Sequence, residues 1–332
     1  MMTHGANIYK YAKEIGCHPD EIIDFSSNIN LYQPEMQLSL SPTAIAKYPD
    51  LNYTELKELI ATKYEIDSEQ IALYKGATSA IHTLLKSLKR EDVYLYEPLF
   101  GEYEKAAKKK NIYRINRITD LEHEPTDDSI VIFVNPSTPE GEYYDLAELF
   151  KLWMDANCTI ILDESFLEFE ELASYRNRIN EYKKLYVIQS FSKFHSCAGV
   201  RVGAIFSHKK NIKKLPNELW SISAFDEAFL KERLVDEEFA KESRRVHKEQ
   251  KAELNAILEE SGYFSEIVES DTNFILTNTP KGRELFEHLL QHKILTRPCQ
   301  SFTYLSENWL RFAVKDRSSH QALREALQLF NN

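Results

Sequence analysis

Short apolar runs alternate with helical patterns through the middle of this chain, and that alternation restricts the fold more than any other feature. Three apolar runs, each followed by a helical pattern, cover residues 71–74, 93–96 and 129–134. The helices expected after them cover residues 79–88, about 100–110 and 145–156. Further apolar runs cover residues 159–162, 185–189 and 202–207. Such alternation predicts an α/β fold with a large, mainly parallel sheet that helices cover on both faces.

Polar residues or glycine stand where these expected strands end. They are Gly76, Glu97, Asn135, Asp163 and Ser190. Sheets of this type bind ligands beyond the carboxyl ends of their strands. The sequence therefore predicts a ligand site that these residues share.

The pattern changes after Pro216 and predicts a smaller α/β domain. A long charged helix is expected over about 226–260, with further helices over 283–292 and 319–330. Strand-like segments cover residues 273–276, 294–297 and 309–314. We expect three parts: an arm over residues 1–35 that joins the small domain, a large domain over 36–215 that holds the predicted ligand site, and the small domain over 216–332.

Composition excludes several classes of partner. The net charge is −11 over 332 residues, which argues against a nucleic-acid-binding protein. No apolar stretch is long enough to span a membrane, and the first residues do not resemble a signal peptide. The four cysteines and ten histidines show no metal-ligand spacing, so we expect reduced thiols, no metal and a cytoplasmic protein.

Lys193 is the strongest candidate for a catalytic residue. It lies in Ser190-Phe191-Ser192-Lys193, directly after the apolar run that ends at Gln189, and Arg201 follows eight residues later. Burial lowers the pKa of a lysine and frees its amine for attack on a carbonyl carbon. The nearby hydroxyls and guanidinium are suitable donors to a phosphate. The segment predicts a lysine that holds pyridoxal 5′-phosphate as an imine, with an exposed loop lysine as the alternative.

Two other strand ends agree with this cofactor. Gly76, Ala77 and Thr78 come between a strand and a helix, where free N–H groups favour an anion; an ordinary Ser or Thr helix cap is the alternative. Asp163 ends a very apolar strand, and a carboxylate there is costly unless it is paired. A protonated pyridine nitrogen would pair with it, although a structural salt bridge or a helix cap would also explain an aspartate there.

Three further residues extend the predicted site. Phe100 could stack on a flat ring or belong to the core. Arg297 and Arg311 each fall on a short strand of the small domain, and arginine is suited to a bidentate grip on carboxylate or phosphate. Two such arginines indicate an anionic substrate.

These segments, in this order, resemble the fold-type-I pyridoxal-phosphate enzymes of the aminotransferase superfamily over nearly the whole chain. Residues 4–8 (HGANI) and 23–30 (IDFSSNIN) are similar to the opening of the L-threonine-O-3-phosphate decarboxylases of cobalamin biosynthesis. Residues 163–166 and 192–194 also look more like those enzymes than like the related histidinol-phosphate aminotransferases.

The resemblance implies a role for each matching residue. Lys193 would form the imine and move protons, Asp163 would pair with the ring nitrogen, and Phe100 and Ser165 would face the ring. The residues that would hold the cofactor phosphate are Gly76, Ala77, Thr78, Ser190, Ser192 and Arg201. Tyr48 would reach that phosphate from the neighbouring subunit, which implies a homodimer. The residues that would hold the substrate are His4, Gly5, Asn28, Arg297 and Arg311.

One loop departs from the family pattern. The family normally reads NNPTG where this chain has Ser137-Thr138-Pro139-Glu140-Gly141, so Thr138 stands where an asparagine would contact the phenolic oxygen of the cofactor. Phe166 also lacks a hydroxyl that the aminotransferases direct at that oxygen. Either the Thr138 hydroxyl or Asn135 would have to replace the contact.

The resemblance implies decarboxylation of L-threonine O-3-phosphate or L-serine O-phosphate to an amino-alcohol phosphate. The alternatives are a histidinol-phosphate aminotransferase and a protein that binds pyridoxal phosphate without turnover. No motif distinguishes the two amino-acid phosphates, which differ by one methyl group.

Overall fold

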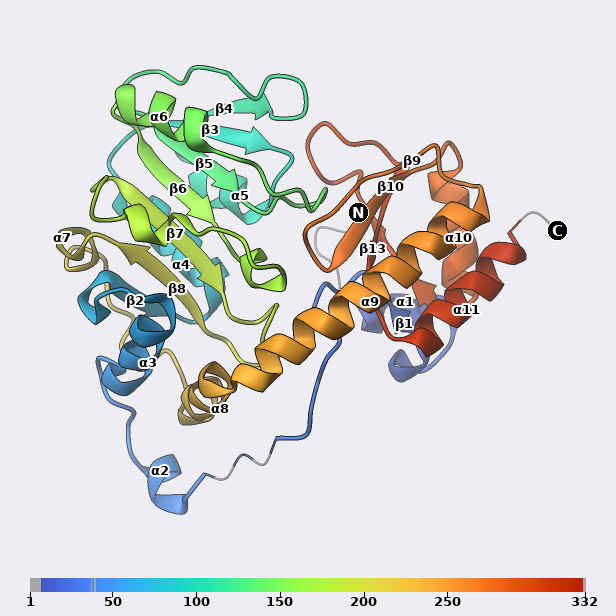
Figure 1. Ribbon diagram of the computed structural model, residues 1–332, viewed down its shortest axis with the longest axis horizontal. Coiled ribbons are helices and arrows are strands. Elements are labelled where there is room, and N and C mark those ends of the chain that lie inside the picture. The colour runs from blue at the N-terminus through green and yellow to red at the C-terminus, as the bar shows by residue number, and fades with distance from the viewer. Residues whose placement is uncertain (1–6, 37, 39, 331–332) are drawn as a thin grey trace.

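The computed structural model describes residues 7–36, 38 and 40–330 of the chain. Two sheet-containing parts lie side by side, and the long helix α9 (Glu237–Ser261) runs between them (Figure 1). The larger part holds a seven-stranded sheet, and the smaller part holds a four-stranded sheet.

The seven-stranded sheet confirms the predicted α/β class. Its strands, in spatial order, are β2 (Ile71–Tyr74), β8 (Gly203–Ser207), β7 (Leu185–Ser190), β6 (Thr159–Asp163), β5 (Ile130–Val134), β3 (Asp92–Glu97) and β4 (Asn111–Asn116). Every neighbouring pair is parallel except the two that include β8. Strand β4 was not predicted because it is an edge strand with mostly exposed or half-exposed side chains and no continuous apolar run.

Helices cover both faces of this sheet. On one face, α3 (Thr54–Tyr64) and α6 (Ala147–Asp155) pack on one set of strand side chains. On the other face, α4 (Gly76–Ser87) and α5 (Glu102–Ala107) pack on the alternate set. Alternate side chains of a strand point to opposite faces, so strands buried on both sides are apolar at nearly every position.

The smaller part combines an antiparallel sheet with three helices. The sheet has the order β12 (Arg297–Pro298), β13 (Trp309–Ala313), β10 (Phe274–Asn278) and β9 (Glu266–Ile267). A shared core joins it to α9, α10 (Gly282–Gln291) and α11 (Arg317–Gln328). The other α-helices of the described residues are α1 (Ile8–Ile15), α2 (Pro42–Ala46), α7 (Lys209–Ile212) and α8 (Ala224–Val235).

The N-terminal segment packs on the smaller part. Strand β1 (Ile23–Asp24) pairs in parallel with β11 (Ile294–Leu295). Phe25 is fully buried, and its ring meets Phe312 edge-on and stacks on His320. These contacts belong to residues 23–25, and the arm over residues 1–35 stays a prediction.

Two expectations for the smaller part were wrong in detail. The long helix expected over about 226–260 is two helices, α8 and α9, which meet at Asp236. Asp236 has a non-helical backbone, and its side chain accepts a hydrogen bond from the backbone N–H of Phe239, so it starts a new helix. The strand expected over 294–297 is divided between β11 and β12, which belong to different sheets.

Among the helices of the described residues, none combines the length and apolar character that crossing a bilayer requires.

We predict that Phe25→Ala lowers the free energy of unfolding by about 3–5 kcal/mol, because it leaves a cavity in the core of the smaller part. Urea unfolding followed by circular dichroism measures this change. Tyr9→Ala, at a side chain that is 74% exposed, is the matched control and should leave stability within about 0.5 kcal/mol of the parent. Equal stability of the two variants would contradict an arm that is integral to the fold.

Candidate active site

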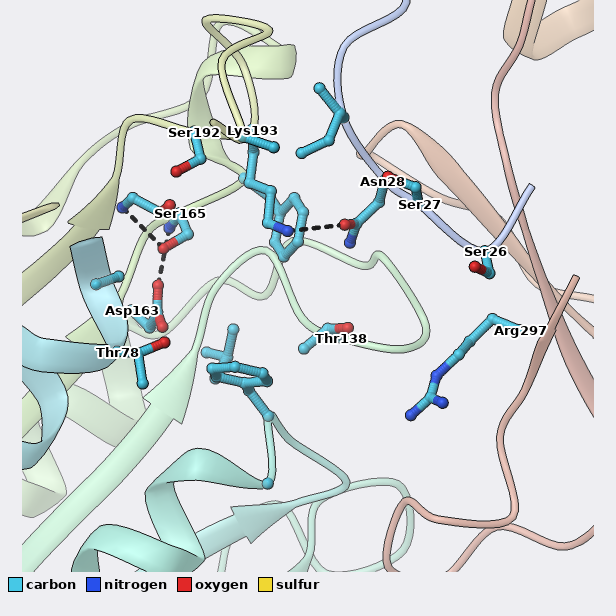
Figure 2. Close-up of a pocket in the computed structure, with 18 of the residues that line it drawn as sticks. Ser26, Ser27, Asn28, Thr78, Thr138, Asp163, Ser165, Ser192, Lys193 and Arg297 are labelled. Carbon is cyan, nitrogen blue, oxygen red and sulfur yellow. Dashed lines mark hydrogen bonds between the residues drawn. The ribbon is translucent and has the colours of Figure 1, made fainter. Parts of the chain in front are cut away.

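A cavity of about 320 Å³ lies at the carboxyl ends of β5, β6 and β7. Its walls come from the arm, the large sheet and the smaller part of the chain. In Figure 2, Thr78, Asp163, Ser165 and Ser192 lie to one side of the Lys193 side chain. Ser26 and Arg297 lie to the other side, and Thr138 lies between the two groups.

Lys193 is half-buried in this cavity, and its amine contacts the arm. Nζ donates a hydrogen bond to Asn28 Oδ1 over 3.0 Å (Figure 2). Burial, helped by the nearby positive charges of Arg311 and Arg201, lowers the pKa of Lys193 to about 8. A substantial fraction of the amine is therefore neutral near physiological pH and able to act as a nucleophile.

Asp163 is only 4% exposed and has two neutral hydrogen-bond donors. The Tyr103 hydroxyl donates to Oδ2 over 2.7 Å, and the Ser165 N–H donates to Oδ1 over 3.0 Å. Burial raises the pKa of Asp163, and these hydrogen bonds only partly oppose that effect. These two hydrogen bonds orient the carboxylate. Because both donors are neutral, they do not cancel its negative charge, and the carboxylate can still pair with a cation.

The start of α4 is built for close approach of an anion. The helix begins at Gly76, its N-cap residue is Lys75, and the Lys75 side chain makes no capping hydrogen bond, so the N-cap is not a serine or threonine. Gly76 has φ +80°, and a Cβ there would lie 2.8 Å from Arg201 Nη2. A Cβ on Gly203 would lie 2.3 Å from the backbone nitrogen of Ala77. These two glycines let strand β8, the Arg201 guanidinium and the N–H groups of α4 meet at one point.

Three serines complete this end of the cavity. Ser165, Ser190 and Ser192 all line it. The Ser190 N–H donates to Ser165 Oγ over 3.0 Å, which ties the end of β7 to the segment that follows β6. The three serines therefore share the cavity with Ala77 and Thr78 of the first turn of α4.

The two predicted arginines lie opposite each other on neighbouring strands. Arg297 of β12 pairs in register with Arg311 of β13, and both are almost fully buried. Arg297 Nη2 donates to Ser301 Oγ over 2.9 Å, and Arg311 Nη1 donates to Thr138 Oγ1 over 3.1 Å. Burial lowers the pKa of Arg311 to about 10, although it stays charged at neutral pH. Two adjacent buried cations form a strong site for an anion.

Thr138 faces the cavity, whereas Asn135 does not take its place. Both ends of the Asn135 side-chain amide bond the backbone of Tyr144, at 2.9 and 3.0 Å. Of the two residues considered for the missing contact, Thr138 is the one that lines the cavity. Phe100 and Phe166 also line it, and the Phe166 ring packs edge-on against Phe274.

Tyr48 lies away from this cavity, and two further predicted residues are not described by the structure. The Tyr48 side chain is 79% exposed, and its ring centroid lies 4.6 Å from that of Trp220. It is not among the residues that line this cavity. His4 and Gly5 lie outside the described residues.

Sequence reasoning missed several residues of the site. Tyr103 falls in the helix expected over about 100–110 with no motif around it, and only the fold shows that its hydroxyl reaches Asp163. Ser301 and Phe302 line the cavity from the loop between β12 and β13, and the Phe302 ring lies 5.3 Å from the Arg297 guanidinium. The four-residue separation of Ser301 from Arg297 carried no recognisable signal.

The residues present fit pyridoxal 5′-phosphate. A half-buried lysine amine suits its aldehyde, an oriented buried carboxylate suits its ring nitrogen, and the start of α4 with Arg201 suits its phosphate. These three features line or adjoin one cavity, as the prediction required.

Comparison with known proteins identifies relatives of two activities. The chain is 30% identical to a protein of Caldanaerobacter subterraneus provisionally named threonine-phosphate decarboxylase, over 98% of this chain and 93% of the relative. It is 29% identical to a bifunctional adenosylcobalamin-biosynthesis protein of Leptospira interrogans, over 97% of this chain but only 40% of that longer protein. Among solved structures, histidinol-phosphate aminotransferase from Clostridium acetobutylicum is 26% identical with a TM-score of 0.81, covering 93% of this chain and 99% of the other.

The family described as "Aminotransferase class I and II" matches residues 20–330, nearly the whole chain. The structural similarity extends over both sheets and identifies the predicted fold type I architecture. From the geometry of the cavity and this match, the chain belongs to the aminotransferase class I and II family, whose members depend on pyridoxal 5′-phosphate.

Proposed function

We propose that this protein decarboxylates L-threonine O-3-phosphate, or L-serine O-phosphate, and releases an amino-alcohol phosphate for the nucleotide loop of a cobamide. The observation that carries the proposal is that the cavity has polar groups for two separate parts of a substrate. Arg297 and Arg311 form a cationic end, and the Asn28 amide lies beside the Lys193 amine.

The cofactor would be held by the residues already described. Lys193 would bind its aldehyde carbon, Asp163 its ring nitrogen, and Phe100 and Ser165 would flank the ring. Its phosphate would be held by Gly76, Ala77, Thr78, Ser190, Ser192 and Arg201. When bound, pyridoxal phosphate supplies an electron sink for the bond that breaks at the substrate carbon.

The arginines favour decarboxylation through the orientation they give the substrate. If Arg297 and Arg311 bind the substrate phosphate, its carboxylate is not drawn into their pocket. The carboxylate would then be free to leave as CO₂, with bound pyridoxal phosphate supplying the electron sink. An amide at Asn28, beside the amine-binding position, suits a substrate that carries a carboxylate next to its amine.

The second candidate is histidinol-phosphate aminotransferase, and the similarity to the solved enzyme from Clostridium acetobutylicum favours it. Its substrate has a phosphate for the arginines but no carboxylate. Under this alternative, Asn28 would have no substrate carboxylate to bind.

We also propose a homodimer in which Tyr48 serves the neighbouring site. Several large apolar side chains are exposed around α2 and Trp220, and they are Ile45, Tyr48, Leu51, Leu219 and Trp220. Exposed apolar groups gathered on one surface are typical of protein interfaces. A second copy of the chain would cover them.

Decarboxylation of both amino-acid phosphates is the direct test. We expect release of CO₂ without a keto acid, faster with one phosphate than with the other by about 10- to 100-fold, since one methyl group provides about 1–3 kcal/mol of discrimination. The control, Lys193→Ala, should release no CO₂ and lack the visible absorption of lysine-bound cofactor. Turnover only with an amino and keto pair would establish the aminotransferase, and cofactor absorption without any product would indicate a binding protein.

Asp163→Asn should have opposite effects on the cofactor-free and cofactor-bound protein. Burial raises the pKa of Asp163 in the fold, so its carboxylate destabilises the cofactor-free protein above that pKa and stops doing so as the pH falls. We expect the variant to melt at a higher temperature than the parent without cofactor at pH 7, with a difference that shrinks on acidification. Its affinity for the cofactor should fall about 100-fold through loss of the buried ion pair. Unchanged affinity would contradict the pairing with the ring nitrogen.

Complementation between subunits tests the role of Tyr48. Tyr48→Ala and Lys193→Ala should each be impaired alone, whereas co-expressed chains should regain about a quarter of parental activity. Half of the randomly formed dimers are mixed, and each mixed dimer has one intact site. Activity that stays at the level of the separate variants would contradict a site shared between subunits.

A further inference from the structure

The contact between Lys193 and Asn28 has a fixed polarity. A protonated lysine amine can donate hydrogen bonds but cannot accept one. Its partner is therefore the side-chain carbonyl oxygen of Asn28, Oδ1, which accepts from Nζ over 3.0 Å. The amide nitrogen of Asn28 must then face another direction. Asn28 is only 8% exposed and lines the same cavity as Lys193. One side chain therefore presents an acceptor to the lysine and keeps a separate donor.

The arm holds Asn28 at a set distance from the lysine backbone. The Asn30 N–H donates to the Lys193 carbonyl over 3.0 Å, and Asn30 Nδ2 donates to the Phe194 carbonyl over 2.7 Å. The Ser196 hydroxyl donates back to the Asn30 carbonyl over 2.7 Å. These bonds hold the arm, two residues after Asn28, against the segment that carries Lys193, and so keep the Asn28 backbone close to the lysine.

Other charges around Nζ do not position it in the same way. Arg201 and Arg311 oppose a positive charge on the amine, and Asp163 favours one. Asn28 makes the direct hydrogen bond to Nζ that the structure shows. In Figure 2, Nζ points to Asn28, while Asp163 lies on the other side of the lysine side chain.

We propose that Asn28 is a positioning residue that holds the free Lys193 amine for the return of a proton to the carbon that has lost CO₂. This inference rests on the proposed decarboxylation. Lys193 is free in each turnover once the substrate amine has displaced it. CO₂ leaves without the electron pair of the broken C–C bond. That pair takes a proton from the Lys193 ammonium, an N–H bond breaks, a C–H bond forms, and Nζ becomes a neutral amine.

The configuration of the deuterated carbon in the product reports whether Lys193 is held in position. In D₂O, a lysine held on one side delivers deuterium to one face of the carbon, so the aminomethyl group of the product has one configuration. Asn28→Ala leaves Nζ free to move, and solvent can compete with it. We expect a mixture of both configurations and a fall in kcat of about 100-fold. Nuclear magnetic resonance of the product after chiral derivatisation measures the ratio.

Two variants separate positioning from substrate binding. Asn28→Asp keeps an acceptor for Nζ but replaces the amide donor by a negative charge, so it should retain one configuration while KM rises. Arg297→Lys should also raise KM and retain one configuration, because it alters only the cationic end of the cavity. A product of single configuration from Asn28→Ala would overturn the proposal.

A second measurement does not depend on decarboxylation. In the full-length chain freed of cofactor, trinitrobenzenesulfonate reacts with neutral amines, and peptide mass spectrometry follows Lys193 alone as the pH is varied. Loss of the acceptor in Asn28→Ala should lower the apparent pKa of Lys193 by about one pH unit, and Asn28→Asp should raise it. Identical profiles for all three proteins would overturn the proposal. If neither phosphate is decarboxylated while these profiles differ as expected, the proposed function fails and the contact between Asn28 and Lys193 stands.

Discussion

The cavity depends on charged groups that are buried beside neutral partners. Asp163 accepts hydrogen bonds from a tyrosine hydroxyl and a backbone N–H, and Arg311 donates to a threonine hydroxyl and the Ser26 carbonyl. Burial of a charge without a counter-ion costs free energy of folding, so packing elsewhere in the protein must offset that cost. The seven-stranded sheet, apolar on both faces, provides that packing. Both charges then remain available for a cation and an anion brought by ligands.

Much of this arrangement could be predicted from the sequence because it follows from strand ends. Asp163, Ser190 and Lys193 each come at or just after an apolar run, and parallel strands bring such ends to one edge. Edge strand β4 and the break at Asp236 lacked a comparable signal, since one has no apolar run and the other interrupts a continuous helical pattern. Tyr103 and Ser301 were missed because their roles depend on contacts across the fold or within a loop.

Thr138 is held at two points by buried arginines. Its hydroxyl oxygen accepts from Arg311, which leaves its single hydrogen available to donate elsewhere. Its backbone carbonyl accepts from the buried Arg117, which also forms an ion pair with Glu140. A residue fixed at its backbone by one arginine and at its hydroxyl by another has little freedom. We infer that the substitution of threonine for asparagine in this loop is compatible with a well-ordered site.

The arm makes hydrogen bonds beside Arg311 at one end of the cavity and beside Lys193 at the other. The Phe25 carbonyl accepts from Ala313 just after Arg311, and the Ser27 carbonyl accepts from Lys315, so the arm is fastened beside the cationic end. Three residues further on, Asn30 bonds the backbone of Lys193 and Phe194. Fewer than ten residues of arm therefore separate its contacts with the strand that carries Arg311 from its contacts with the segment that carries Lys193. Asn28 lies between these two attachments, so the short stretch of arm that places Asn28 beside the lysine amine is held at one end by the strand of Arg311 and at the other by the segment of Lys193.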